Sequence, residues 1–263
     1  MTASITADKK PQNPPRRASP TSALADRWIP KLVLSPSIVI SLIFVYGFIG
    51  ICVFLGLFLA ILLDQKIRNE GALRAIFLYP MALSFIVTGT AWQWILNPSL
   101  GLEKVFHDWG WTSFSFNWLG DPDKAIFCVV IAAVWQSTGF VMALFLAGLR
   151  GVDAEIFKAA QVDGATLPTI YRKIVIPSMR PVFFSVLLIL CHITIKTFDL
   201  LVALTAGGPG TSSSLPAMFM YTFSFNRGQL GVGAASSMMM LATVVAVLVP
   251  LMYLESRSTR NAA

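Results

Sequence analysis

Two apolar stretches of the chain contain clusters in which tryptophan stands beside amide and hydroxyl side chains. A sugar presents hydroxyl groups for hydrogen bonding and an apolar ring face that can lie on an aromatic side chain, so these clusters suit a carbohydrate. Helix packing through small and polar residues explains the Ser and Thr residues equally well. Both interpretations stay open, and the candidate residues are Trp92, Gln93, Trp135, Gln136 and Thr138.

A third apolar stretch contains two charged residues, Lys196 and Asp199. Charged side chains in apolar surroundings are costly, and they usually pair with each other or face an aqueous pathway. At positions i and i+3 of a predicted helix, these two residues are neighbours on one face and can neutralise each other. They are either a structural pair near the outer helix end or part of the lining of a sugar path.

The composition predicts a membrane protein, because 56% of the 263 residues are hydrophobic and only 13% are charged. Ordinary soluble domains contain roughly 45–50% apolar residues. The apolar runs are long enough for spanning helices and too long for barrel strands. We therefore predict an all-α, polytopic transmembrane bundle. The basic residues behind the net charge of +7 flank the predicted spans, so no nucleic-acid partner is expected.

Five apolar segments are apparent, and one of them has an unusual length. Leu32–Leu63 contains no charge, and its length of about 48 Å as a helix is too long for one untilted crossing and too short for two. The other four predicted spans are Ala75–Leu96, Ala125–Leu149, Val182–Ala203 and Val232–Leu254.

The distribution of basic residues indicates which connections are cytoplasmic. It places the N-terminal tail, the 64–75 connection, a charged central insert and the C-terminus on the same side. One crossing between the tail and residue 64 cannot satisfy this arrangement. We therefore expect 32–63 to be either a compressed hairpin or two fused spans whose outer loop is missing, joined near residues 47–50. Five spans would then be apparent where six are expected.

Composition also suggests the boundaries of the domain. Residues 1–31 are polar and rich in Pro, Ser and Thr, and they predict a disordered, basic cytoplasmic tail without a cleavable signal. Residues 32–254 form the predicted transmembrane domain, and residues 255–263 a second cytoplasmic tail. The three cysteines lie inside apolar runs, so no disulfide framework is predicted.

The central insert, residues 150–178, reads as two short helices with well-defined ends. Asp153 can cap a helix beginning at Ala154, Glu155 suits its positive end, and Gly164 suits the left-handed residue that stops it. A second helix follows, with Thr166 as its cap, Pro168 in its first turn and Pro177 at its end. The insert therefore predicts a rigid elbow rather than a flexible connector.

The spacing within the elbow resembles the EAA signature of membrane subunits in bacterial ABC importers. The matching residues are Lys158, Ala159, Ala160, Gly164, Ile174 and Pro177. In that family the elbow is a coupling helix that docks in a cleft of the ATP-binding subunit. Lys158 stands where the family usually has Glu, so a docking ion pair built on that Glu cannot be carried over. Glu155 or Asp163 are candidates for the missing acid.

The resemblance covers residues 30–255 and is greatest to glucose/mannose-type permeases of the carbohydrate-uptake branch. It implies an inner-membrane location and a sugar substrate, such as glucose or mannose. It also implies two ATP-binding subunits, a second homologous permease and a periplasmic sugar-binding protein as partners. The chain has no Walker motif, and we predict no catalytic residue, cofactor or metal site.

Three other functions remain open. The chain could transport another sugar or a glycerol-phosphate type of solute. It could be an ion-coupled secondary transporter, although no internal repeat is apparent and Asp199 is the only acid well inside an apolar run. It could also be a truncated remnant that keeps the elbow but does not transport.

Overall fold

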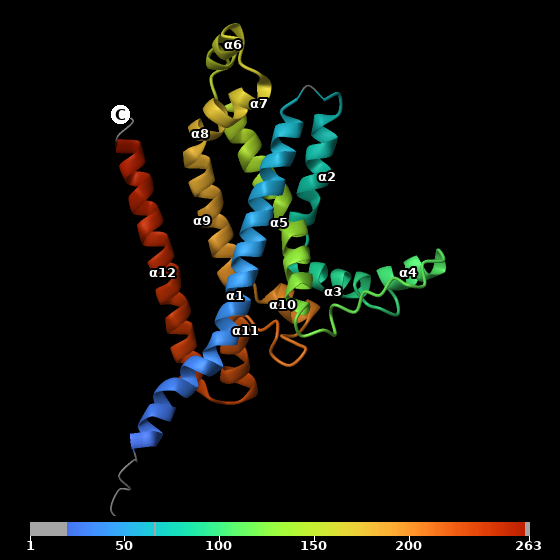
Figure 1. Cartoon of the computed structure of the whole chain (residues 1–263), viewed down its shortest axis with the longest axis vertical. Coiled ribbons are helices and arrows are strands. Elements are labelled where there is room, and N and C mark those ends of the chain that lie inside the picture. The colour runs from blue at the N-terminus through green and yellow to red at the C-terminus, as the bar shows by residue number, and fades with distance from the viewer. Residues whose placement is uncertain (1–19, 66, 261–263) are drawn as a thin grey trace, which may run out of the picture. The chain divides into compact units, whose positions relative to one another are not determined.

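The computed structural model describes the backbone of residues 20–65 and 67–260, and side chains within 41–65, 67–194, 197–246 and 249–250. It divides into two units, Met1–Pro36 and Ser37–Ala263, and the architecture below is that of the second. All regular secondary structure in the described residues is helical (Figure 1). The elements are α1 (Pro20–Leu63), α2 (Glu70–Ala82), α3 (Phe85–Ile95), α4 (Leu102–Asp108), α5 (Ala125–Arg150), α6 (Ala154–Val162), α7 (Leu167–Ile170), η1 (Tyr171–Val175), α8 (Ile176–Ser178), α9 (Arg180–Lys196), α10 (Asp199–Leu204), α11 (Pro216–Tyr221), η2 (Thr222–Asn226) and α12 (Leu230–Arg260).

Helix α5 is the centre of the bundle and corresponds to the predicted span Ala125–Leu149. It packs against α2 and α9, and against α3 and α10 near the end opposite the elbow (Figure 1). Glycines allow the close approach of these helices. A Cβ on Gly139 would lie 1.8 Å from the carbonyl oxygen of Phe77 in α2, and one on Gly148 would lie 2.8 Å from the Val182 side chain in α9. Small residues commonly have this role in membrane helix packing.

The predicted hairpin in residues 32–63 is wrong, because α1 continues through Gly47 and Gly50 without a break. Its part Ser41–Leu63 is long and apolar enough for one crossing. No residue there has the positive φ that a tight turn would need. Every backbone group in this stretch can be satisfied inside a helix, which is the favourable solution in lipid. The alternative, two fused spans, stays a prediction.

The predicted span Ala75–Leu96 is two helices, α2 and α3, that meet at an angle of 98°. Pro80 lies in the last turn of α2, and Leu83 is extended. Ser84 then caps α3 by accepting a hydrogen bond from the N–H of Ile86 (3.3 Å). The prediction treated 75–96 as one span because the sequence is apolar throughout, and it overlooked the end of α2 and the cap of α3.

The predicted span Val182–Ala203 is also interrupted, because α9 ends at Lys196 and α10 begins at Asp199. Thr197, the residue directly after α9, has ψ of 79° and leaves the helical conformation. Its hydroxyl donates to the carbonyl oxygen of Ile193 (2.8 Å). The prediction that Lys196 and Asp199 share one helix face is therefore wrong. The side chain of Lys196 lies outside the described residues, and that of Asp199 is exposed.

The polytopic helical prediction is confirmed, although the segments differ from those expected. Two helices of the described chain are long and apolar enough to cross a membrane, or up to four if each bent pair counts as one span. The expected span Val232–Leu254 lies within α12, whose described apolar part is Leu230–Ala246. The predicted tail boundary at residue 31 falls inside α1, and residues 1–19 lie outside the described chain.

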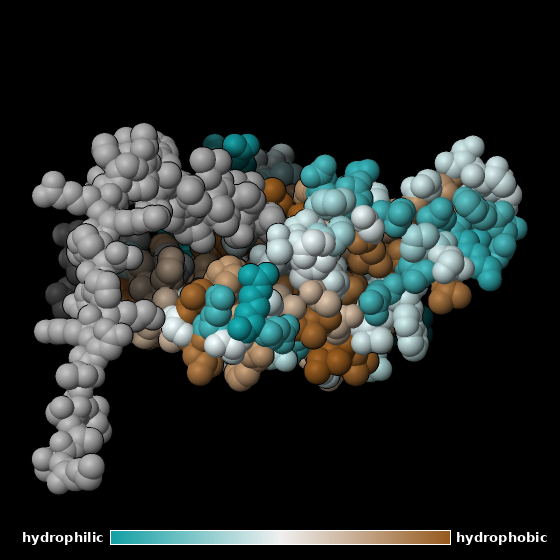
Figure 2. Space-filling view, turned by 90° about the horizontal axis from the view of Figure 1, so that it is seen from below, coloured by the Kyte–Doolittle hydropathy of each residue, from teal (hydrophilic) through white to brown (hydrophobic). Residues whose placement is uncertain are grey.

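An outer arm, residues 97–124, extends from the end of the bundle opposite α6 (Figure 1). It carries α4 and a series of ring contacts that joins Phe106, Phe114, Phe116 and Trp118. Figure 2, seen from that end, shows hydrophilic surface gathered over the arm, with apolar patches beside it. Glu103 fixes the arm by accepting a hydrogen bond from the N–H of Phe116 (3.0 Å). The arm and the elbow therefore lie at opposite ends of the bundle.

Candidate functional site

The first half of the elbow is α6, which begins as its sequence predicts. The Asp153 carboxylate accepts a hydrogen bond from the N–H of Glu155 (2.8 Å) and caps the helix. Helical periodicity then separates two faces. Ala160 is buried and Phe157 is half-buried against the bundle, whereas Val162 is 87% exposed. The elbow therefore holds one face against its own chain and leaves another exposed.

The outward surface of the elbow is partly apolar. Ile156 and Leu167 are each 50% exposed, and together with Val162 they give the elbow three exposed aliphatic side chains. Single exposed aliphatic residues are common on protein surfaces. The predicted coupling residues Lys158, Ala159 and Asp163 are also exposed. Lys158 forms no ion pair with the side chains described.

The corner of the elbow is Gly164, with φ of +80°, as the sequence predicts. Its N–H donates to the carbonyl oxygen of Gln161, and the next N–H, of Ala165, donates to Ala160 (3.0 Å each). These two bonds satisfy carbonyls at the end of α6 in the manner of a glycine C-cap. Thr166 stands at the start of α7 as predicted, but its hydroxyl bonds to the hydroxyl of Thr169 (2.8 Å) rather than to a backbone N–H.

The second helical segment ends at Ser178, one residue after Pro177, so the predicted end is correct to within a residue. The segment runs from α7 through a π-helical turn, η1, into α8, which contains Pro177, and a bend of 67° follows before Arg180. Proline lacks an N–H and its ring clashes with the carbonyl four residues earlier. Widening the turn before Pro177 into a π-helix relieves this clash, so the helix passes the proline. Ile174 and Pro177 are both half-buried, facing the bundle in part.

The elbow contacts the connection between α1 and α2, on the same end of the bundle (Figure 1). The hydroxyl of Tyr171 in η1 donates to the Asp64 carboxylate (3.0 Å), and the Gln65 amide donates to the same hydroxyl (3.5 Å). Arg150, the last residue of α5, pairs with Glu70, the first of α2, at 2.6 Å. Partial burial raises the pKa of Tyr171, and the Asp64 carboxylate raises it further.

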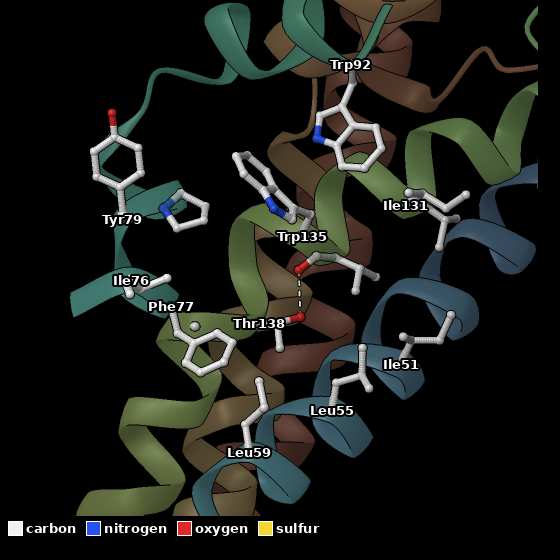
Figure 3. Close-up of a pocket in the computed structure, with 14 residues that line it drawn as sticks. Ile51, Leu55, Leu59, Ile76, Phe77, Tyr79, Trp92, Ile131, Trp135 and Thr138 are labelled. Atoms are coloured by element: carbon white, nitrogen blue, oxygen red, sulfur yellow. Dashed lines mark hydrogen bonds between the residues drawn. The ribbon is translucent and has the colours of Figure 1, made fainter. Parts of the chain in front are cut away.

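Three of the predicted sugar-path residues line one groove of about 700 Å³ between α1, α2, α3 and α5 (Figure 3). Trp92 and Trp135 meet edge to face, with ring centroids 5.9 Å apart. Thr138 lies deeper along α5 and donates its hydroxyl to the carbonyl oxygen of Val134 (2.6 Å). Most of the remaining lining is aliphatic, including Leu55 from α1. Few polar groups therefore face this groove.

The other predicted path residues lie away from this groove. Gln93 is exposed on α3, and Asp199 begins α10. Gln136 is buried, and its amide donates to the carbonyl oxygen of Leu83 (2.9 Å), at the break between α2 and α3. It satisfies a carbonyl that the 98° bend leaves without a helical partner. The structure thus gives Gln136 a structural contact rather than a place in the groove.

Sequence reasoning missed Tyr171, Asp64, Arg150 and Glu70 as a group. Tyr171 and Asp64 are 107 residues apart, and Arg150 and Glu70 are 80 apart, so no local pattern connects them. The sequence did offer a partial indication of the Arg150–Glu70 pair. Both residues are charged, and both lie at the ends of spans on the same predicted side of the membrane. Val162, which is 87% exposed, was not among the predicted coupling residues.

The helical bundle defines a polytopic membrane protein with a capped, well-defined elbow at one end. Residues 16–257 match the family described as "binding-protein-dependent transport system inner membrane component". The chain belongs to this family, and it is a multi-pass inner-membrane permease subunit of a carbohydrate ABC importer.

Individual relatives agree with this assignment. The chain is 39% identical over 221 residues to a probable ABC transporter permease protein of Pyrococcus horikoshii, covering 84% of this chain and 74% of that one. It is 35% identical over 219 residues to the xylose/arabinose import permease protein XacH of Haloferax volcanii, covering 82% and 68%. A crystal structure of a bacterial ABC transporter that imports the acidic polysaccharide alginate has a similar fold, with a TM-score of 0.72 at 18% identity, covering 85% and 78%.

Proposed function

We propose that this chain translocates a monosaccharide across the inner membrane and that separate ATP-binding subunits drive the movement by docking on the elbow. The observation that carries the proposal is the elbow itself, a fixed corner at Gly164 with exposed aliphatic side chains at Ile156, Val162 and Leu167. A rigid element transmits displacement, whereas a flexible connector would absorb it. The proposed coupling residues are Asp153, Glu155, Lys158, Ala159, Ala160, Asp163, Gly164, Ile174 and Pro177.

The exposed acids Glu155 and Asp163 are the proposed charged partners for the ATP-binding subunit. Glu155 lies in the first turn of α6, where a negative charge is favoured by the helix dipole. Lys158 lies one turn further along the same helix and is also exposed, so the docking surface carries both signs of charge. A partner surface complementary to it needs an apolar centre with a basic and an acidic group at its rim.

The proposed substrate is a monosaccharide such as glucose or mannose. The resemblance of the sequence to glucose/mannose-type permeases supports a hexose, while the name of the Haloferax relative supports pentoses. The groove beside Trp92 and Trp135 offers two aromatic rings to an apolar sugar face. Because few polar groups line it, a second homologous permease completes the hydrophilic path in this proposal, and a periplasmic sugar-binding protein delivers the sugar.

Uptake by the reconstituted assembly tests this function. The chain, a second permease, the ATP-binding subunits and the binding protein are placed in lipid vesicles, and accumulation of labelled glucose, mannose and xylose is measured. We expect accumulation of one of these sugars only when ATP reaches the ATP-binding subunits, and no effect of a protonophore. Accumulation driven by a proton gradient without those subunits would identify an ion-coupled carrier instead. A stable assembly that accumulates no sugar would indicate a remnant without transport activity.

A further inference from the structure

The helices of the bundle differ in how they are joined to the elbow. The elbow is continuous in the chain with α5 on one side and with α9 on the other. Helices α1 and α2 have no such continuity with it. Displacement of the elbow therefore moves α5 and α9 directly, and reaches the α1–α2 connection only through side-chain contacts and packing.

Those contacts converge on the two ends of the α1–α2 connection. At its start, directly after α1, Asp64 accepts the hydrogen bond from Tyr171 (3.0 Å), and Gln65 donates to the same hydroxyl. At its end, Glu70 at the start of α2 pairs with Arg150 at 2.6 Å. The connection is thus held at both ends by residues of the elbow or of the helix leading into it.

Tyr171 also contacts α6, the first helix of the elbow. The ring of Phe157 in α6 meets the Tyr171 ring at 78°, with centroids 6.1 Å apart. Phe157 also packs against the hydrophobic core of the bundle, which includes the buried residues Leu63 of α1 and Ile170 of α7. A continuous chain of contacts therefore runs from α6 through Phe157 and Tyr171 to Asp64.

We propose that Tyr171, Asp64, Arg150 and Glu70 form a clasp that makes α1 and α2 follow the elbow when the ATP-binding subunits move it. This inference rests on the proposed function, and it assigns these four residues a positioning role rather than contact with the sugar. An exposed ion pair contributes little to stability, and a single hydrogen bond is a small part of the free energy of folding. The clasp therefore acts mainly on coupling, and its loss leaves the bundle folded.

The test measures sugar accumulated per ATP hydrolysed by the reconstituted assembly. Tyr171→Phe removes only the hydroxyl and keeps the ring contact with Phe157, and Asp64→Leu removes the acceptor. We expect each change to lower this ratio about fivefold or more while ATP hydrolysis continues, since about 1 kcal/mol changes a population ratio by that factor. Asp64→Asn keeps an acceptor oxygen and should retain most of the ratio. Tyr221→Phe, a tyrosine of α11 at the opposite end of the bundle, is the matched control and should not change it.

Two further sets of variants separate a clasp from a general structural effect. The double variant of Tyr171→Phe and Asp64→Leu should be no worse than the poorer single variant, because both changes break the same bond. Arg150→Glu and Glu70→Arg should each lower the ratio, and their combination should restore it. If the unmodified assembly shows no ATP-dependent uptake, the proposed function itself fails. If it transports and Tyr171→Phe keeps the unmodified ratio, the clasp alone is refuted.

Discussion

Replacing Gly164 with proline is expected to uncouple ATP hydrolysis from sugar uptake. Proline holds φ near −65°, whereas Gly164 has φ of +80°. The substitution also removes the N–H that donates to the carbonyl oxygen of Gln161 (3.0 Å). The corner between α6 and α7 must then change its direction, and the docking face of α6 is no longer fixed relative to α9.

The expected size of this effect follows from the strain. Forcing an ordinary residue into left-handed geometry costs about 1–2 kcal/mol, and proline cannot adopt it at all. We expect uptake to fall at least about tenfold, the factor that corresponds to 1.4 kcal/mol, while the assembled complex still hydrolyses ATP. Gly164→Asn is the matched variant, because asparagine tolerates this conformation and no atom lies within 4 Å of the added Cβ. Wild-type uptake by Gly164→Pro would show that the corner does not transmit motion.

Replacing Gly139 with alanine is expected to cause the largest loss of stability. The new Cβ would lie 1.8 Å from the carbonyl oxygen and 2.5 Å from the carbonyl carbon of Phe77. Because the obstacle is the backbone of α2, no side-chain rotation relieves the clash. Helices α2 and α5 must separate, and the groove that both of them line must change shape. We expect destabilisation of about 3 kcal/mol, at the upper end of the usual range for overpacked cores.

Thermal unfolding of the purified permease in detergent measures this effect. Gly50→Ala in α1 is the matched control, because nothing lies within 4 Å of its added Cβ. Alanine is the better helix former by about 0.5–1 kcal/mol, so this variant should unfold at the same or a higher temperature. The two alanine variants should therefore shift the unfolding temperature in different directions. Equal stability of Gly139→Ala and the unmodified chain would contradict the close packing of α2 on α5.

The elbow was the most predictable part of the structure, since its signals are local. A cap at Asp153 and a positive φ at Gly164 depend on residues within one helical turn. Pro177 marks the end of the second helix to within one residue, but the sequence does not show the π-helical turn that precedes it. The bend at Leu83 was also missed, because hydropathy is continuous across Pro80 and Ser84, the two residues that mark the break.

The distant contacts could not be predicted from one sequence. Thr138 and the two tryptophans line one groove, but that shared groove depends on how α3 and α5 pack. Gln136 and Gln93 each follow a tryptophan in the sequence. Gln136 is nevertheless buried against the Leu83 carbonyl, whereas Gln93 is exposed. Helix rotation decides between these outcomes, and uniformly apolar helices give little indication of it.

Docking on the elbow is the central claim, and Val162 is the residue that tests it most directly. Its side chain is 87% exposed on α6 and forms part of the aliphatic surface that we propose for docking. Val162→Asp would place a carboxylate in an apolar contact, where burying a charge without a partner costs several kcal/mol. Val105→Asp, at a 41% exposed position of α4 on the outer arm, is the matched control.

The measurement is the amount of co-expressed ATP-binding subunit that co-purifies with this chain. We predict that Val162→Asp lowers it at least about tenfold and that Val105→Asp leaves it unchanged. Full recovery of the ATP-binding subunit with Val162→Asp, or an equal loss with Val105→Asp, would contradict the account.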